Sequence, residues 1–124
     1  MVSSEAEEQA AVIEWAGWMA GRYPCLKWIY HCPNGGHRHK GEAARLKAQG
    51  VKAGVSDLFL PYPCGGYAGL YVEMKHGRNG TTAAQEEFLA YAASVGYKTA
   101  VCYSADEAMA VITGYLEGEA WTRD

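Results

Sequence analysis

Glu73 and Lys75 are the two residues whose types and spacing point most directly to chemistry. They lie in the run Gly69–Lys75, whose apolar and aromatic residues are typical of a β-strand. Because side chains alternate between the two faces of a strand, Glu73 and Lys75 point the same way. Two charged side chains on one face of an otherwise apolar strand are unusual, because a buried charge needs a partner or a metal ion.

The preceding predicted strand, residues 55–60, brings a third charged residue to the same place. If the two strands form a hairpin with Leu60 opposite Leu70, Asp57 falls opposite Glu73. Directly opposed residues have Cβ atoms about 5 Å apart. The hairpin therefore predicts one patch that contains both carboxylates and the lysine.

The chemistry expected of such a patch is metal-assisted hydrolysis. Two carboxylates at this separation repel each other unless a cation lies between them, and oxygen ligands favour Mg²⁺ or Mn²⁺. Lys75 beside them could hold or activate a water molecule, or neutralise charge that develops on a phosphate. The alternative is a surface hairpin in which Glu73 and Lys75 form a solvated ion pair.

The composition is that of an ordinary globular domain. The chain has 124 residues, of which 49% are hydrophobic and 20% charged. We therefore expect one domain over residues 1–124 and exclude a disordered tail, a collagen or a charge-rich coiled coil. The sequence contains no run of about 18 apolar residues, the length that a membrane-spanning helix needs. Met1–Glu5 carries no basic segment followed by an apolar run, so we expect no signal peptide and a cytoplasmic protein.

The charged residues are unevenly distributed along the chain. The net charge is −3, which argues mildly against a nucleic-acid partner. Between His37 and Lys52, however, the only acidic residue is Glu42, whereas the rest of the chain is acidic. A basic block in an acidic protein predicts an anion-binding surface, the alternative being a solvated helix face. The basic residues of this block are Arg38, Lys40, Arg45, Lys47 and Lys52.

The cysteines do not form a recognisable metal motif. There is no C-x-x-C pair, and nothing predicts an oxidising compartment. We interpret the cysteines as small, reduced hydrophobic residues. The alternative is a zinc site, although the spacing of its ligands would fit no common pattern. Its ligands would come from Cys25, His31, Cys32, His37 and His39.

Helix caps and turn residues predict an α/β fold with the order α-β-α-β-β-α-β-α. Ser4, Thr82 and Ser104 each stand three residues before a Glu or Gln, a pattern that predicts three helix starts. Runs rich in β-branched and aromatic residues predict the strands. The predicted helices cover about residues 4–20, 41–49, 82–94 and 104–117, and the predicted strands residues 26–31, 55–60, 69–75 and 97–103.

The pattern Asp57…Glu73-Met74-Lys75 resembles the PD-(D/E)xK nuclease superfamily, and longer motifs resemble its VRR-NUC branch over residues 5–115. Ser56 replaces the proline of the superfamily motif, which shapes the backbone and does no chemistry. The longer motifs are a P-N-G-G-x-R turn at Pro33–Arg38, the segment A-x-x-L-K-x-x-G-V-x-x-G-V-x-D-L at Ala43–Leu58, the strand G-L-Y-V-E-x-K at Gly69–Lys75, a helix beginning near Gln85 and a strand beginning at Gly96-Tyr97.

The resemblance implies a restriction-endonuclease-like fold, in which helices flank a four-stranded mixed β-sheet. It also implies hydrolysis of phosphodiester bonds with Mg²⁺ or Mn²⁺. At the matching positions, Asp57, Glu73 and the backbone carbonyl of Met74 resemble the metal ligands. Lys75 resembles the residue that positions water or stabilises charge, and Gln85 the helix residue that orients this lysine or a phosphate.

A glutamate of the first helix commonly completes sites of this family. The Ser-Glu at the start of this helix favours Glu5, with Glu8 as the rival. The other interpretation is that these are ordinary acidic residues of a first helical turn, which the helix dipole favours.

The resemblance further implies DNA as the partner. Stand-alone members of the branch resemble structure-specific nucleases of phages and bacteria that act on branched DNA such as Holliday junctions. Two symmetric cuts call for a homodimer, and a phage-encoded chain would act in the host cytoplasm. The alternative function is a non-catalytic DNA-binding module with the same fold. The residues expected to contact DNA are Asn34, Gly36, His37, Arg38, Lys40, Arg45, Lys47 and Lys52.

Overall fold

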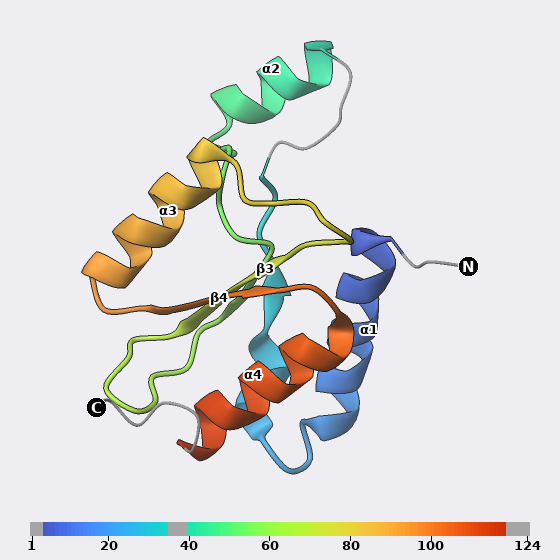
Figure 1. Cartoon of the computed structure of the whole chain (residues 1–124), viewed down its shortest axis with the longest axis vertical. Helices are drawn as coiled ribbons and strands as arrows, with labels where there is room; N and C mark the ends of the chain where they lie inside the picture. Colours follow the sequence, from blue (N-terminus) through green and yellow to red (C-terminus); the bar gives the residue numbers. More distant parts are fainter. Residues whose placement is uncertain (1–3, 35–39, 119–124) are drawn as a thin grey trace.

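The computed structural model describes residues 4–34 and 40–118 (Figure 1). Within these ranges no helix has the length and apolar character needed to cross a membrane. The helices are α1 (Glu5–Met19), the short 3₁₀ helix η1 (Pro24–Trp28), α2 (Lys40–Ala48), α3 (Ala83–Ser94) and α4 (Ala105–Glu117). The strands are β1 (Tyr30–His31), β2 (Leu58–Leu60), β3 (Leu70–Met74) and β4 (Lys98–Cys102).

The four strands form one mixed sheet in the order β1-β2-β3-β4. The pairs β1–β2 and β2–β3 are antiparallel, and β3–β4 is parallel. Leu60 pairs with Leu70, and Leu58 pairs with Val72. The predicted hairpin register is therefore confirmed, as is the predicted four-stranded mixed sheet flanked by helices.

One face of the sheet carries the hydrophobic core. Helices α1 and α4 pack against each other and against β3 on this side (Figure 1). Alternation sends every second residue of β2 and β3 toward these helices, and those side chains are buried. The cluster includes Val12, Ala16, Leu58, Leu60, Leu70, Val72, Met74, Ala108, Ile112 and Tyr115.

The opposite face of the sheet carries an aromatic layer, and α3 lies on it. The Phe59 ring stacks on Tyr71 with centroids 4.4 Å apart. Tyr71 also meets Phe88 of α3 edge-on at 5.0 Å and Tyr97 at 5.3 Å. By alternation, Glu73 follows Tyr71 on this same face, so the charged patch lies next to the aromatic layer and outside the apolar core.

The predicted strand at residues 26–31 is wrong over most of its length. Residues 24–28 form η1, and only Tyr30 and His31 pair with β2. Pro24 stands in the first turn of η1, where its fixed φ favours a helical start. The turn buries Leu26 in the core, so packing overrides the local preference for an extended chain.

Two of the three predicted capping boxes form completely. Ser4 with Glu7 begins α1, and Thr82 with Gln85 begins α3. At α4 the box is only half formed. The Ser104 side chain accepts from the backbone N–H of Glu107, but Glu107 Oε1 accepts from the backbone N–H of Tyr103.

Candidate active site

Asp57 stands directly before β2, and its carboxylate reaches across to β3. Its Oδ2 accepts a hydrogen bond of 2.7 Å from the backbone N–H of Met74. Its own carbonyl accepts from the backbone N–H of Cys32 at 2.8 Å, which extends the pairing of β1 with β2. The backbone on both sides therefore holds Asp57 beside Glu73, as the hairpin register predicts.

Asn34 holds the other oxygen of this carboxylate. Its Nδ2 donates to Asp57 Oδ1 at 3.1 Å and also lies 3.4 Å from the carbonyl of Val55. The sequence motif suggested that Asn34 contacts DNA through an exposed turn. In the structure it is half-buried and orients an acidic side chain of the site. The remaining turn residues predicted to bind DNA, Gly36, His37 and Arg38, lie outside the described residues.

Glu73 is a buried acid with one unsatisfied oxygen. The residue is 2% exposed, and its Oε1 is buried with no hydrogen-bond partner within the described chain. Its pKa is raised from 4.5 to about 8, chiefly by burial and also by the charge of Asp57, while the charge of Lys75 acts in the opposite direction. Two adjacent carboxyl groups with this environment favour a shared proton or a cation.

Lys75 and Gln85 complete the polar cluster. The Lys75 ammonium donates to Gln85 Oε1 at 2.6 Å and lies 3.8 Å from Glu73 Oε2. Gln85 Nε2 in turn donates to Glu73 Oε2 at 3.2 Å. Gln85 thus contacts both charged side chains and fixes the distance between them.

Helix α3 holds Gln85 by the same residues that begin the helix. Gln85 Oε1 accepts from the backbone N–H of Thr82 at 2.8 Å, and Thr82 Oγ1 accepts from the backbone N–H of Gln85 at 3.2 Å. One side chain therefore caps the helix and orients Lys75. The sequence shows the capping pattern and, separately, that Gln85 matches the helix residue of the family motif. Only the structure shows that one side chain serves both purposes.

The two glutamates proposed for the first helix have different surroundings. Glu5 Oε2 accepts from Asn79 Nδ2 at 3.4 Å, and its charge adds to the raised pKa of Glu73. Glu8 Oε1 accepts from the backbone N–H of Ala105 at 2.6 Å, at the start of α4. Glu5 therefore lies toward the polar cluster, whereas Glu8 joins α1 to α4.

The oxygen atoms of this cluster fit a divalent cation. A cation would satisfy the buried Glu73 Oε1 and remove the repulsion from Asp57. Met74, between Glu73 and Lys75 in the chain, could supply its backbone carbonyl as a third oxygen. Over residues 4–34 and 40–118, no three His, Cys, Asp or Glu side chains gather into a metal site. The remaining ligands would therefore be backbone or water oxygens, which Mg²⁺ commonly keeps.

The cysteines have no role in the polar cluster. Cys25, Cys32, Cys64 and Cys102 are all free thiols, and Cys102 is buried. Two of the histidines considered for a zinc site, His37 and His39, lie outside the described residues.

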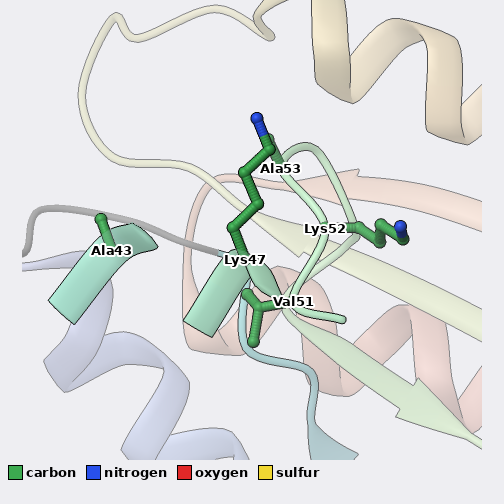
Figure 2. Close-up of a pocket in the computed structure, with 5 residues that line it drawn as sticks. All are labelled: Ala43, Lys47, Val51, Lys52 and Ala53. Carbon is green, nitrogen blue, oxygen red and sulfur yellow. The ribbon is translucent and has the colours of Figure 1, made fainter. Parts of the chain in front are cut away.

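The described residues of the basic block, from Lys40 to Lys52, lie on α2 and in the segment that follows it, and Arg38 lies outside the described residues. None of the residues of this helix is buried, and Figure 1 shows it at the end of the molecule, beyond the first turn of α3. Lys47 and Lys52 line a cavity of about 250 Å³ with Ala43, Val51 and Ala53. Figure 2 shows the two lysine side chains extending from this lining in different directions. Lys40, Arg45, Lys47 and Lys52 are all exposed.

Sequence reasoning missed two features of the site. Asn34 was assigned to a DNA-contacting turn, and nothing local signals that it bonds Asp57, 23 residues later. Ser56, at the motif's proline position, is completely buried, and within the described residues its hydroxyl has no hydrogen-bond partner. A buried hydroxyl without a hydrogen bond is unfavourable, so a serine directly before Asp57 marks this position as unusual.

Comparison with known proteins agrees with this geometry. The family model of the VRR-NUC domain matches residues 3–106. The fold is similar to that of a solved structure described as a VRR-NUC domain protein, with a TM-score of 0.76 and 32% sequence identity over 94% of this chain and 91% of that chain. No curated protein matches the sequence. Because the family model covers most of the chain, the predicted resemblance is confirmed: the chain belongs to the VRR-NUC domain family, a family of nucleases.

Proposed function

We propose that the chain is an endonuclease that hydrolyses phosphodiester bonds in DNA and depends on Mg²⁺ or Mn²⁺. The observation that carries this proposal is the buried Glu73 carboxyl, which has an unsatisfied oxygen and a raised pKa beside Asp57. Such an arrangement is unfavourable in a purely structural position. It suits a site that exchanges a proton for a cation.

Each side chain of the cluster has a separate role in this proposal. Asp57, Glu73 and the Met74 carbonyl would hold the metal ion. When bound, the ion would polarise a phosphate oxygen and promote ionisation of water. In the reaction a water oxygen would bond to phosphorus and give up a proton, while one ester P–O bond breaks and the leaving oxygen takes up a proton. Lys75 positions this water or neutralises the charge that develops on the phosphate.

Gln85 and Glu5 support these groups in the same proposal. Gln85 holds the Lys75 ammonium at a fixed distance from Glu73. Glu5 adds a third negative charge near the pair. It would hold water at the edge of the site and so help to complete it.

The proposed substrate is branched DNA, such as a four-way junction. The basic residues on and after α2 would contact phosphates, and such contacts give an affinity for DNA that does not depend on its base sequence. A four-way junction presents two symmetric scissile strands, so the proposal includes a two-fold homodimer that places one site on each strand.

Wild-type protein is expected to cut branched DNA in Mg²⁺ or Mn²⁺ and to lose all cutting in EDTA. The measurement is denaturing electrophoresis of end-labelled four-way junction, flap, splayed-arm and linear duplex DNA. Folded protein that binds these substrates but cuts none of them in either metal would support the alternative, a non-catalytic DNA-binding module. Titration with Mn²⁺ distinguishes the two further, because the nuclease should bind the ion and Asp57→Asn should weaken that binding.

Removal of two positive charges from α2 should reduce the salt dependence of DNA binding. Lys40 and Lys47 are exposed and lie two helical turns apart, on one face. If each contacts one phosphate, the negative slope of log K against log salt should become shallower by about 2 in the double alanine variant. Lys27→Ala, an exposed lysine outside this block, is the matched control. An unchanged slope would place the DNA on another surface.

A further inference from the structure

A second cavity opens beside the polar cluster, between α3 and the segment that leads into β2. Its volume is about 290 Å³, large enough for a planar aromatic group. None of the residues that line it has a role in the proposed hydrolysis. They include Lys52, Val55, Ala84, Glu87, Phe88 and Tyr91.

Both walls of this cavity are directly connected to the candidate active site. On one wall, the Val55 carbonyl lies 3.4 Å from the Asn34 amide that also bonds Asp57. On the other wall, Ala84 directly precedes Gln85, which contacts Glu73 and Lys75. Residues of both walls therefore adjoin residues that orient the acidic and basic side chains of the candidate active site.

The segment before β2 and the first turn of α3 are closely packed where Gly54 meets Ala84. Gly54 has a φ of +88°, and a Cβ at this position would lie 2.3 Å from the Ala84 carbonyl oxygen. Only glycine permits both the backbone conformation and the contact. The segment before β2 is therefore pressed against the first turn of α3, and the cavity is present without ligand.

The lining combines a fixed aromatic wall with an exposed aromatic ring, one basic side chain, Lys52, and one acidic side chain, Glu87. Phe88 is held edge-on against Tyr71 at 5.0 Å, and Tyr71 stacks on Phe59. Tyr91 follows Phe88 by three residues, on the same side of α3, and is 64% exposed. Lys52 is exposed as well. A nucleotide base can stack on the aromatic surface while its phosphate contacts the ammonium group, so the lining complements a nucleotide.

We propose that this cavity binds an unpaired nucleotide at a branch point, with its base against Tyr91 and its phosphate near Lys52. The inference rests on the proposed nuclease function and specifies its substrate. A base inside a duplex is stacked on both sides and cannot enter such a cavity without unpairing. A branch point or single-stranded arm offers an unstacked base without that cost. The cavity would therefore select DNA that contains unpaired nucleotides next to the cut.

Substitution of Tyr91 tests this inference without requiring cleavage. The probe is a splayed-arm duplex with 2-aminopurine at the first unpaired position, studied in EDTA. Wild type should change the fluorescence of the probe and prefer it to a linear duplex. Tyr91→Ala should weaken binding to the probe by about 5- to 100-fold and leave duplex affinity unchanged. Tyr91→Phe should retain the preference, and Tyr62→Ala, another exposed tyrosine, should behave as wild type.

The outcomes separate this inference from the nuclease proposal. If Tyr91→Ala keeps the wild-type preference and fluorescence change while wild type cuts DNA, the inference is wrong and the nuclease stands. If wild type stacks the probe through Tyr91 but never cuts DNA in Mg²⁺ or Mn²⁺, the cavity binds nucleotides and the nuclease proposal is wrong. If wild type binds no DNA, both are wrong. Because Tyr91 is mostly exposed, its substitution should leave the thermal unfolding midpoint unchanged, which confirms that each variant is folded.

Discussion

Lys75→Met is expected to reduce DNA cleavage by about 10²- to 10⁴-fold, the range observed when a side chain that transfers a proton or stabilises developing charge is removed. Methionine keeps the apolar length of the side chain, so the site stays filled, but it removes the ammonium that Gln85 holds 3.8 Å from Glu73 Oε2. DNA binding without metal should change little, because Lys75 is buried and not part of the basic block on α2. The measurement is single-turnover cleavage with binding determined in parallel.

A lysine on the neighbouring strand is the matched control for this experiment. Lys98 begins β4, and its ammonium lies over the Tyr67 ring, 5.5 Å from the centroid. Lys98→Met removes one positive charge from the same sheet but not from the polar cluster, so cleavage should stay close to wild type. Equal loss in both variants would indicate a general charge effect, and full activity of Lys75→Met would show that the lysine is not catalytic.

Glu73→Gln is expected to stabilise the metal-free protein, increasingly so as pH rises. The pKa of Glu73 is raised to about 8 in the folded state, whereas the unfolded chain loses this proton near the ordinary value. Between these two values the folded state binds more protons than the unfolded state, so the free energy of unfolding falls as pH increases. The slope is about 1.4 kcal/mol per pH unit, and glutamine removes it. Between pH 5.5 and 7.5 the variant should gain about 2–3 kcal/mol relative to wild type.

Metal should offset this difference in stability. A ligand at 100 times its Kd stabilises a protein by about 2.7 kcal/mol, and Mn²⁺ should do so in wild type but not in Glu73→Gln, which lacks the carboxylate. Urea unfolding at several pH values, in EDTA and in Mn²⁺, measures both effects. Glu14→Gln, at an exposed position of α1, controls for the loss of one negative charge. A variant less stable than wild type in EDTA at pH 7.5 would contradict the raised pKa.

Local periodicity was sufficient to predict the central hairpin. A strand has a period of two residues, so once Leu60 is placed opposite Leu70, the pairing of the whole hairpin follows. For this reason the sequence alone places Asp57 beside Glu73. Helix starts were similarly predictable, since Ser4 and Thr82 act on N–H groups only two or three residues away.

Local preference failed where burial opposed it. Residues 26–29 have the composition of a strand, yet Leu26 and Ile29 are buried by a 3₁₀ turn. The box at Ser104 is half formed for a local reason, because Glu107 accepts from the backbone N–H of Tyr103.

The sequence by itself determined the acidic pair with its lysine and the order of the elements, because strand alternation and helix caps act over a few residues. It also determined the family, through motifs spread along most of the chain. The tertiary structure alone decided that Asn34 bonds Asp57, that Gln85 joins Lys75 to Glu73, and that Gly54 lies against α3. These contacts connect residues on separate elements, and their formation depends on how α3 and the segment before β2 dock on the sheet. Docking follows from the packing of whole surfaces, which no short motif encodes.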